Sequence, residues 1–215
     1  RGEAVFEIWN AAGLDVMALG NHEFDWGLDV LRARLEQAHF PVLAANLQTE
    51  SGQPLQELLP GVSPYTVLDA EGIRVGILGL TYHDLATVVR ASAIEGIRSL
   101  PGIEAAQRYL PELEDRADLV VVLSHLGLEG DHELAHAFPE ISFIIGGHSH
   151  ALLKQGVRTG GVTIAQAGAY GEYLGKIQFT YDPSKQAMSS EGIQAATLPV
   201  AGVVPAGFRL SMAGC

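Results

Sequence analysis

The chain has 215 residues, which suits a single domain, and 47% of them are hydrophobic against 18% charged, so a packed core is expected and disorder is excluded. Its 25 acidic and 13 basic residues give a net charge of −12, which argues against a broad surface for nucleic acids or anionic membranes. The sequence contains no run of about 18 apolar residues, so no membrane span is predicted. The single cysteine, Cys215, excludes an intrachain disulfide.

The N-terminal part of the chain predicts helices that alternate with strands. Apolar side chains at helical spacing over residues 1–12 predict a helix that ends at Gly13. Residues 14–19 predict a short buried strand, residues 20–27 a polar loop, and residues 28–38 an amphipathic helix. Because the first helical pattern begins at once, without an initiator methionine or a signal peptide, we interpret the N-terminus as lying inside a domain.

The next stretch predicts strands that are separated by turns. Residues 42–45 form a short apolar run, and residues 48–64 contain enough glycine and proline to predict a long surface connection. Residues 65–69 and 73–80 flank a Glu-Gly pair at 71–72, which predicts a β-hairpin.

The middle of the chain returns to alternating elements. Residues 101–116 predict a helix and residues 118–123 a buried strand. Asp131 is interpreted as the N-cap of a short helix that runs through Phe138, because aspartate accepts hydrogen bonds from the first turn of a helix. Residues 141–145 predict the next buried strand.

The C-terminal part predicts mostly strands. Residues 162–167 and 174–181 are strand candidates, residues 187–200 predict an edge strand, and residues 201–215 resemble a linker or a chain end. Helices alternating with strands, followed by strands alone, favour an α/β sandwich with mixed sheets.

Three polar clusters each follow a predicted strand. They are residues 20–25 (GNHEFD), residues 124–127 (SHLG) and residues 146–150 (GGHSH). Loops at the carboxyl ends of strands are where α/β sheets gather their functional sites. The placement of the clusters therefore predicts that they meet in one site.

The histidines of the second and third clusters are candidate metal ligands. In an extended segment His148 and His150 would point to the same side, and the glycines before them allow a sharp bend. Neutral imidazole nitrogens suit Zn, Mn or Fe. A His-x-His pair alone is a weak signal, and a lone His125 would be read as structural, but together they form a credible nitrogen set.

The first cluster offers an amide ligand and a candidate acid. Asn21 provides an amide oxygen for a divalent cation, and His22 would stand at the mouth of the cavity. Asp25 is placed to accept a hydrogen bond from His22, and a histidine held by a carboxylate is suited to protonating a leaving-group oxygen. The alternative for Asp25 is a cap or turn residue.

Together these motifs, which run from residue 20 to residue 150, resemble the later motifs of the calcineurin-like metallophosphoesterases. The long form GNHEFDWG, with Asn46 downstream, is similar to the 5'-nucleotidase and UDP-sugar hydrolase subgroup. The resemblance implies a four-layer sandwich of two mixed β-sheets flanked by helices, incomplete at the N-terminus. It also implies a hydrolase that acts on phosphate ester bonds of nucleoside monophosphates or related nucleotides through a dinuclear metal-activated hydroxide.

The resemblance also implies roles for individual side chains. His22 would be the catalytic histidine, paired with Asp25, and Asn46 would contact the substrate. Two divalent metal ions (Zn, Mn, Fe or similar) would be held by four side chains, namely Asn21, His125 and His148 at the second ion and His150 at the first.

The chain departs from the family pattern before Asn21. The family opens with Asp-x-His and Gly-Asp, which supply three of the seven expected ligands, and neither motif is present there. Asp131 follows a glycine but is interpreted as a helix cap. We therefore expect the chain by itself to bind the second ion only weakly and to be poorly active.

The resemblance further implies a larger protein. Residues 1–200 would form most of the catalytic domain, with substrate specificity supplied by a separate C-terminal domain and with a periplasmic or extracellular location. Two alternatives remain: a thiosulfohydrolase on the same scaffold, and a non-catalytic, metal-poor domain.

Other polar side chains are given simpler interpretations. His39, His132 and His136 are expected to be structural or solvated, and His83 could line the site from a strand end. Tyr170 lies in a glycine-rich stretch that is interpreted as a tight connection between strands.

Overall fold

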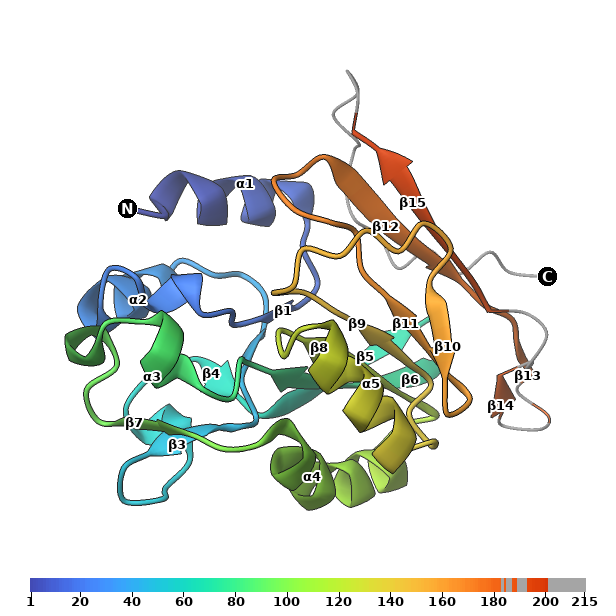
Figure 1. Ribbon diagram of the computed structural model, residues 1–215, viewed down its shortest axis with the longest axis horizontal. Helices are drawn as coiled ribbons and strands as arrows, with labels where there is room; N and C mark the ends of the chain where they lie inside the picture. The colour runs from blue at the N-terminus through green and yellow to red at the C-terminus, as the bar shows by residue number, and fades with distance from the viewer. Residues whose placement is uncertain (183, 185–186, 189–192, 201–215) are drawn as a thin grey trace.

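A computed structural model describes residues 1–182, 184, 187–188 and 193–200, and Figure 1 shows its elements. The helices are α1 (Glu3–Ala12), α2 (Leu28–Leu35), α3 (Leu85–Val88), α4 (Gly102–Arg116) and α5 (Leu128–Ala137), with short 3-10 helices η1 (His22–Phe24), η2 (Leu55–Glu57) and η3 (Ala91–Ala93). The strands are β1 (Met17–Ala18), β2 (Val42–Leu43), β3 (Leu47–Thr49), β4 (Val62–Ser63), β5 (Tyr65–Ala70), β6 (Ile73–Leu80), β7 (Ile97–Ser99), β8 (Leu119–Ser124), β9 (Phe143–Ile145), β10 (Val157–Thr159), β11 (Val162–Ala165), β12 (Tyr173–Gln178), β13 (Tyr181–Asp182), β14 (Ala187–Met188) and β15 (Gln194–Pro199).

A six-stranded mixed sheet in the order β10-β11-β9-β8-β6-β5 forms the centre of the molecule. Its inner strands β11, β9, β8 and β6 are parallel, and its two edge strands are antiparallel to their neighbours. Both faces of the sheet are covered, which explains why β8 is an apolar run with little alternation. Helices α4 and α5 pack on one face (Figure 1), and β2 and β12 contribute to the core on the other.

A smaller parallel sheet, β1-β2-β4, packs closely against the large one. The contact is close at Gly79 of β6, where a Cβ atom would lie 2.3 Å from the Cβ atom of Leu43. Only glycine leaves room for this approach. The backbone N–H of Ala45 also donates to the Gly79 carbonyl at 2.7 Å, so the two sheets are joined where β2 ends. This junction brings the ends of β1 and β8 into one region.

The predicted α/β sandwich with mixed sheets is confirmed, and the predicted hairpin is β5–β6. Residues 48–64 are not a plain connection, because they contain most of β3 as well as η2 and β4. Strand β3 pairs with β7 and β4 pairs with β2, so distant partners stabilise strands that have little local signal. The strand predicted at 14–19 is reduced to β1.

Asp131 is not a helix cap. Helix α5 begins after Gly127, and Asp131 lies inside it with no exposed surface. Its carboxylate faces the loop after β9, since a Cβ atom on Gly146 would meet the Asp131 Oδ2 atom. The predicted edge strand at 187–200 contains β14 and β15, and the predicted linker at 201–215 lies outside the described residues.

Among the described residues, no helix has the length and apolar character needed to cross a bilayer.

Candidate metal site and its surroundings

Three loops that are far apart in the sequence bring Asn21, His125 and His148 together. Asn21 follows β1, His125 follows β8 directly, and His148 follows β9 after two glycines. The Asn21 Oδ1 atom lies 3.0 Å from His125 Nε2 and 3.2 Å from His148 Nδ1. The two imidazole rings meet edge to face with centroids 5.2 Å apart. One amide oxygen and two ring nitrogens therefore share one small volume.

Both histidines are held in the neutral form that ligates metals. Burial, helped by the nearby ring of His148, lowers the pKa of His125 to about 4. Burial also lowers the pKa of His148, with smaller contributions from His150, His22 and His83. Both rings therefore keep a free nitrogen lone pair at neutral pH.

Glycines allow the loops to pack directly against His125. A Cβ atom on Gly20 would lie 2.8 Å from His125 Cε1, and one on Gly147 would lie 3.0 Å from His125 Nδ1. The ring is therefore packed between the loop that contains Gly20 and the loop that contains Gly147. A larger residue at either position would displace it.

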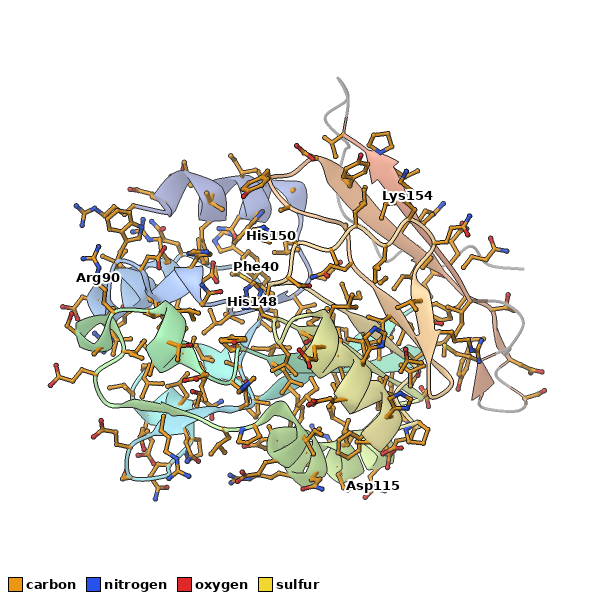
Figure 2. All side chains as sticks on the ribbon, viewed as in Figure 1. Phe40, Arg90, Asp115, His148, His150 and Lys154 are labelled. Carbon is orange, nitrogen blue, oxygen red and sulfur yellow. The ribbon has the colours of Figure 1, made fainter. Side chains whose placement is uncertain are left out.

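His150 lies at the edge of this cluster. The prediction that residues 148–150 are extended is wrong, because His148 and His150 have φ values of 69° and 56° in the left-handed region. Non-glycine residues adopt this conformation uncommonly, and such backbone strain is often found at functional sites. His150 packs against Tyr170, with ring centroids 5.5 Å apart, and it still lies close enough to lower the pKa of His148. Figure 2 labels both histidines in the same part of the molecule.

His22 and Asp25 form the predicted pair. His22 Nδ1 lies 2.9 Å from Asp25 Oδ2, and the His22 side chain is 73% exposed. The 3-10 turn η1 sets this geometry, because it places the two residues on the same side of one turn. His22 therefore stands at the surface beside the cluster with Nε2 available to a ligand.

Two further side chains support the cluster and were not predicted. Tyr82 stacks on His148 with ring centroids 4.2 Å apart and planes at 24°. Glu23 accepts a hydrogen bond from the Gly20 N–H at 2.7 Å, although burial raises the pKa of this carboxyl. The sequence signals were present, since Glu23 lies within the first motif and Tyr82 follows a strand end.

Asn46, the predicted substrate contact, is buried and makes its hydrogen bonds within the fold. Asn46 has no exposed surface, and its amide donates to the carbonyls of Thr81 and Leu100 at 2.7 and 3.1 Å. Its Oδ1 atom accepts from the Thr81 N–H at 2.8 Å. The amide therefore connects three chain segments.

Of two other histidines, one lies near the cluster and one lies away from it. His83 is exposed beside Tyr82, with ring centroids 5.0 Å apart, and contributes to the lowered pKa of His148. His132 lies away from the cluster and contacts the Thr159 hydroxyl at 2.7 Å, as expected for a structural residue.

The donor set fits a borderline divalent cation such as Zn²⁺ or Mn²⁺, because it combines an amide oxygen with two neutral imidazoles. Within the described ranges, no group of three or more His, Cys, Asp or Glu side chains is arranged to hold a metal ion. The Asn21 amide oxygen is the third donor atom of the cluster, next to the two imidazole nitrogens.

Comparison with known proteins supports a family relationship. A sequence profile described as "Calcineurin-like phosphoesterase" matches residues 3–152. A 5'-nucleotidase of Vibrio cholerae is 32% identical over 83% of this chain and 37% of its own length. The crystal structure of a 5'-nucleotidase precursor from Thermus thermophilus superposes with a TM-score of 0.79 and 31% identity, over 93% of this chain and 41% of that one.

A third similar protein is named for a different reaction. The sulfate thiohydrolase SoxB of Thermus thermophilus superposes with a TM-score of 0.80 and 25% identity, over 93% of this chain and 35% of that one. The chain thus spans well under half the length of each of these three proteins.

Proposed function

The chain belongs to the calcineurin-like phosphoesterase family, a family of hydrolases, and on this premise we propose that it is the catalytic part of an enzyme that hydrolyses nucleoside 5'-monophosphates with two divalent metal ions. The observation that carries the proposal is the convergence of Asn21, His125 and His148 from three distant loops. The choice of substrate is supported by similarity to two 5'-nucleotidases over most of the chain.

We assign Asn21, His125 and His148 to one metal ion and His150 to the other. When bound, such ions neutralise phosphoryl oxygens and activate water for attack on phosphorus. The residues of this chain orient the donors: Glu23 holds the first loop through Gly20, and the glycines next to His125 let its ring enter the cluster. Low pKa values leave the imidazoles neutral, so no proton competes for their lone pairs.

His22 is assigned to the leaving group. Asp25 binds its Nδ1 atom at 2.9 Å, which orients the ring and leaves Nε2 to deliver a proton to the departing alcohol oxygen. The exposure of His22 gives a substrate access to this nitrogen. Asp25 thus acts as a positioning residue, because it works through His22.

The surrounding organisation is proposed from the same relationships. Because the chain spans 37% of its Vibrio cholerae relative, we assign residues 1–200 to most of a catalytic domain and the choice of nucleotide to a C-terminal domain of the full-length protein. The family resemblance favours a periplasmic or extracellular setting.

Full-length protein assayed with AMP and Mn²⁺ tests these roles. His22→Ala should lower kcat by roughly 10²–10⁴-fold without changing metal content, since it removes a general acid. His148→Ala should lower both bound metal and activity, because it removes a ligand. His136→Ala, on an exposed part of α5, is the matched control and should change neither quantity.

Unchanged turnover in either site variant would remove that residue from the mechanism. No AMP hydrolysis by the wild type would refute the proposed substrate.

The thiosulfohydrolase alternative is supported by the likeness to SoxB. The same preparation separates the two reactions when it is given either AMP or a thiosulfonate conjugate on a cysteine-containing peptide. Phosphate release from AMP alone supports the nucleotidase, and sulfate release alone supports the alternative.

A further inference from the structure

The loop after β9 holds both of its histidines in a backbone conformation that needs support. The Ser149 N–H donates to the Gly147 carbonyl at 2.8 Å, and His148 between them has a φ of 69°. A hydrogen bond across one residue with positive φ matches the rarer and more strained of the two γ-turn forms. His150 follows with a φ of 56°. Strained conformations of this kind persist only where the surrounding structure fixes them, so contacts to this loop must hold it.

The serine between the two histidines anchors the loop to two other segments. The Ser149 hydroxyl accepts from the backbone N–H of Leu128, the first residue of α5, at 3.2 Å. The same hydroxyl donates to Gln166 Oε1 at 2.8 Å. Because Ser149 lies next to both histidines in the chain, this one anchor acts on both of them.

The large sheet brings Gln166 to this loop. Strands β9 and β11 are parallel neighbours in which Ala165 lies opposite Ile145. Gln166 therefore leaves β11 where the histidine loop leaves β9. The Gly146 N–H donates to the Ala165 carbonyl at 2.8 Å, and the Leu153 N–H donates to the Gln166 carbonyl at 2.9 Å. The backbone on both sides of the two histidines is thus paired with the segment that carries Gln166.

The side chain of Gln166 is costly for stability. Gln166 is 3% exposed, and its Nε2 atom makes no hydrogen bond to any residue that the structure describes. A buried donor without a partner loses its hydration without compensation, so an apolar side chain of similar size would make the fold more stable. A residue that lowers stability and contacts the loop of two proposed metal ligands is expected where function requires it.

We propose that Gln166 is a positioning residue that acts through the Ser149 hydroxyl to hold His148 and His150 in the conformation that binds metal. The inference deepens the proposed function and rests on its assignment of these histidines to metal ions. Side chains that orient metal ligands without touching the ion contribute about 10–100-fold to metal affinity. Gln166 does so by fixing the backbone of the loop and not by contact with an imidazole ring.

Calorimetric titration of metal-free, full-length protein with Mn²⁺ tests the inference and does not depend on the substrate. Gln166→Met keeps a buried side chain of similar size but removes the acceptor, and Ser149→Ala removes the hydroxyl. Each variant should raise the Kd for Mn²⁺ by about tenfold or more. The double variant should bind no more weakly than the weaker single variant, because both changes remove the same hydrogen bond. Ser149→Thr keeps the hydroxyl and should bind Mn²⁺ as the wild type does.

Ile164→Val is the matched control, because Ile164 is buried in β11 two residues before Gln166 and the change removes one methylene group from the core. It should lower the thermal midpoint of the metal-free protein and leave the Kd unchanged. Gln166→Met should instead raise the thermal midpoint, because it removes an unpaired amide, while it weakens Mn²⁺ binding. A contribution to stability alone would not change stability and metal affinity in opposite directions.

Three outcomes would overturn the inference. An unchanged Kd in Gln166→Met and Ser149→Ala, with Mn²⁺ bound by the wild type, refutes it alone and leaves the proposed function intact. Metal affinity that falls together with the thermal midpoint, in Ile164→Val as in Gln166→Met, shows that the glutamine contributes only to stability. A wild type that binds no Mn²⁺ refutes the metal assignment of the proposed function as well.

Discussion

Two carboxyl groups next to the histidine cluster differ in the hydrogen bonds that they accept. Glu23 accepts a backbone hydrogen bond from Gly20 at 2.7 Å, which partly offsets the cost of its burial. Asp131 has no exposed surface, and neither of its oxygens makes a well-formed hydrogen bond to any residue that the structure describes. Burial raises the pKa of Asp131 to about 7, with only the Ser124 hydroxyl opposing the shift.

Asp131→Asn tests this burial through the pH dependence of stability. The unfolded carboxyl ionises near its ordinary pKa of 3.8, whereas the folded one keeps its proton to about pH 7. The folded wild type therefore loses roughly 1.4 kcal/mol of stability per pH unit from about pH 4 to pH 7, and nothing further above that. Denaturant unfolding should show little difference between the two proteins at pH 4 and a more stable variant at pH 8.

The contribution of His125 to the pH dependence of stability is present in both proteins, so it cancels in the stability difference between them. A stability difference that does not vary with pH would contradict the burial of an ionisable Asp131.

Sequence reasoning about single residues succeeded where the local pattern determines the role. The pairing of His22 with Asp25 is set within one turn, so spacing was sufficient to predict it. It failed for the Asp131 cap and did not reveal the burial of Asn46, because an acidic residue near a helix start and an asparagine after a strand look alike whether they are exposed or buried. Only the tertiary contacts with Gly146 and Thr81 decide these cases.

At the level of elements, the site depends on parallel strands that end at a common edge. β8 and β9 pair in parallel within the large sheet, and β1 lies in the smaller sheet packed against it. The two sheets touch at Gly79, so this glycine helps to place Asn21 beside the histidines.

Gly79→Ala should therefore be destabilising. Its Cβ atom would lie 2.3 Å from the Cβ atom of Leu43, and overpacking of this kind costs about 1–3 kcal/mol. Gly175→Ala, on β12, is the control, because its nearest neighbour would be Ala167 Cβ at an ordinary 3.5 Å. Chemical denaturation measures both. Equal stability of the two variants would contradict the close contact of the sheets.

The elements that sequence predicted best are those with local signals. The β5–β6 hairpin has a Glu71-Gly72 turn with positive φ at both residues, and α4 has a long helical pattern. Strands β3 and β4 were missed because each is short and is stabilised by a distant partner. Pairing across the fold does not appear in a sequence window.

For the whole molecule, the net charge is consistent with the kind of ligand that is proposed for the site. A charge of −12 disfavours polyanions as partners, so a small phosphorylated ligand needs local positive charge, which divalent ions can supply. The three motifs predicted the family and most of the cluster. The conformation of His148 and His150, and the stacking of Tyr82, required the folded chain.

The proposed function requires the three loops to form one metal site. Crystals of the full-length protein soaked with Zn²⁺, measured at the zinc absorption edge, test this directly. The expected anomalous peak lies about 2.1 Å from His125 Nε2 and His148 Nδ1, with Asn21 Oδ1 also in coordination range. Anomalous peaks only elsewhere in the molecule, with these three side chains unliganded, would contradict the account.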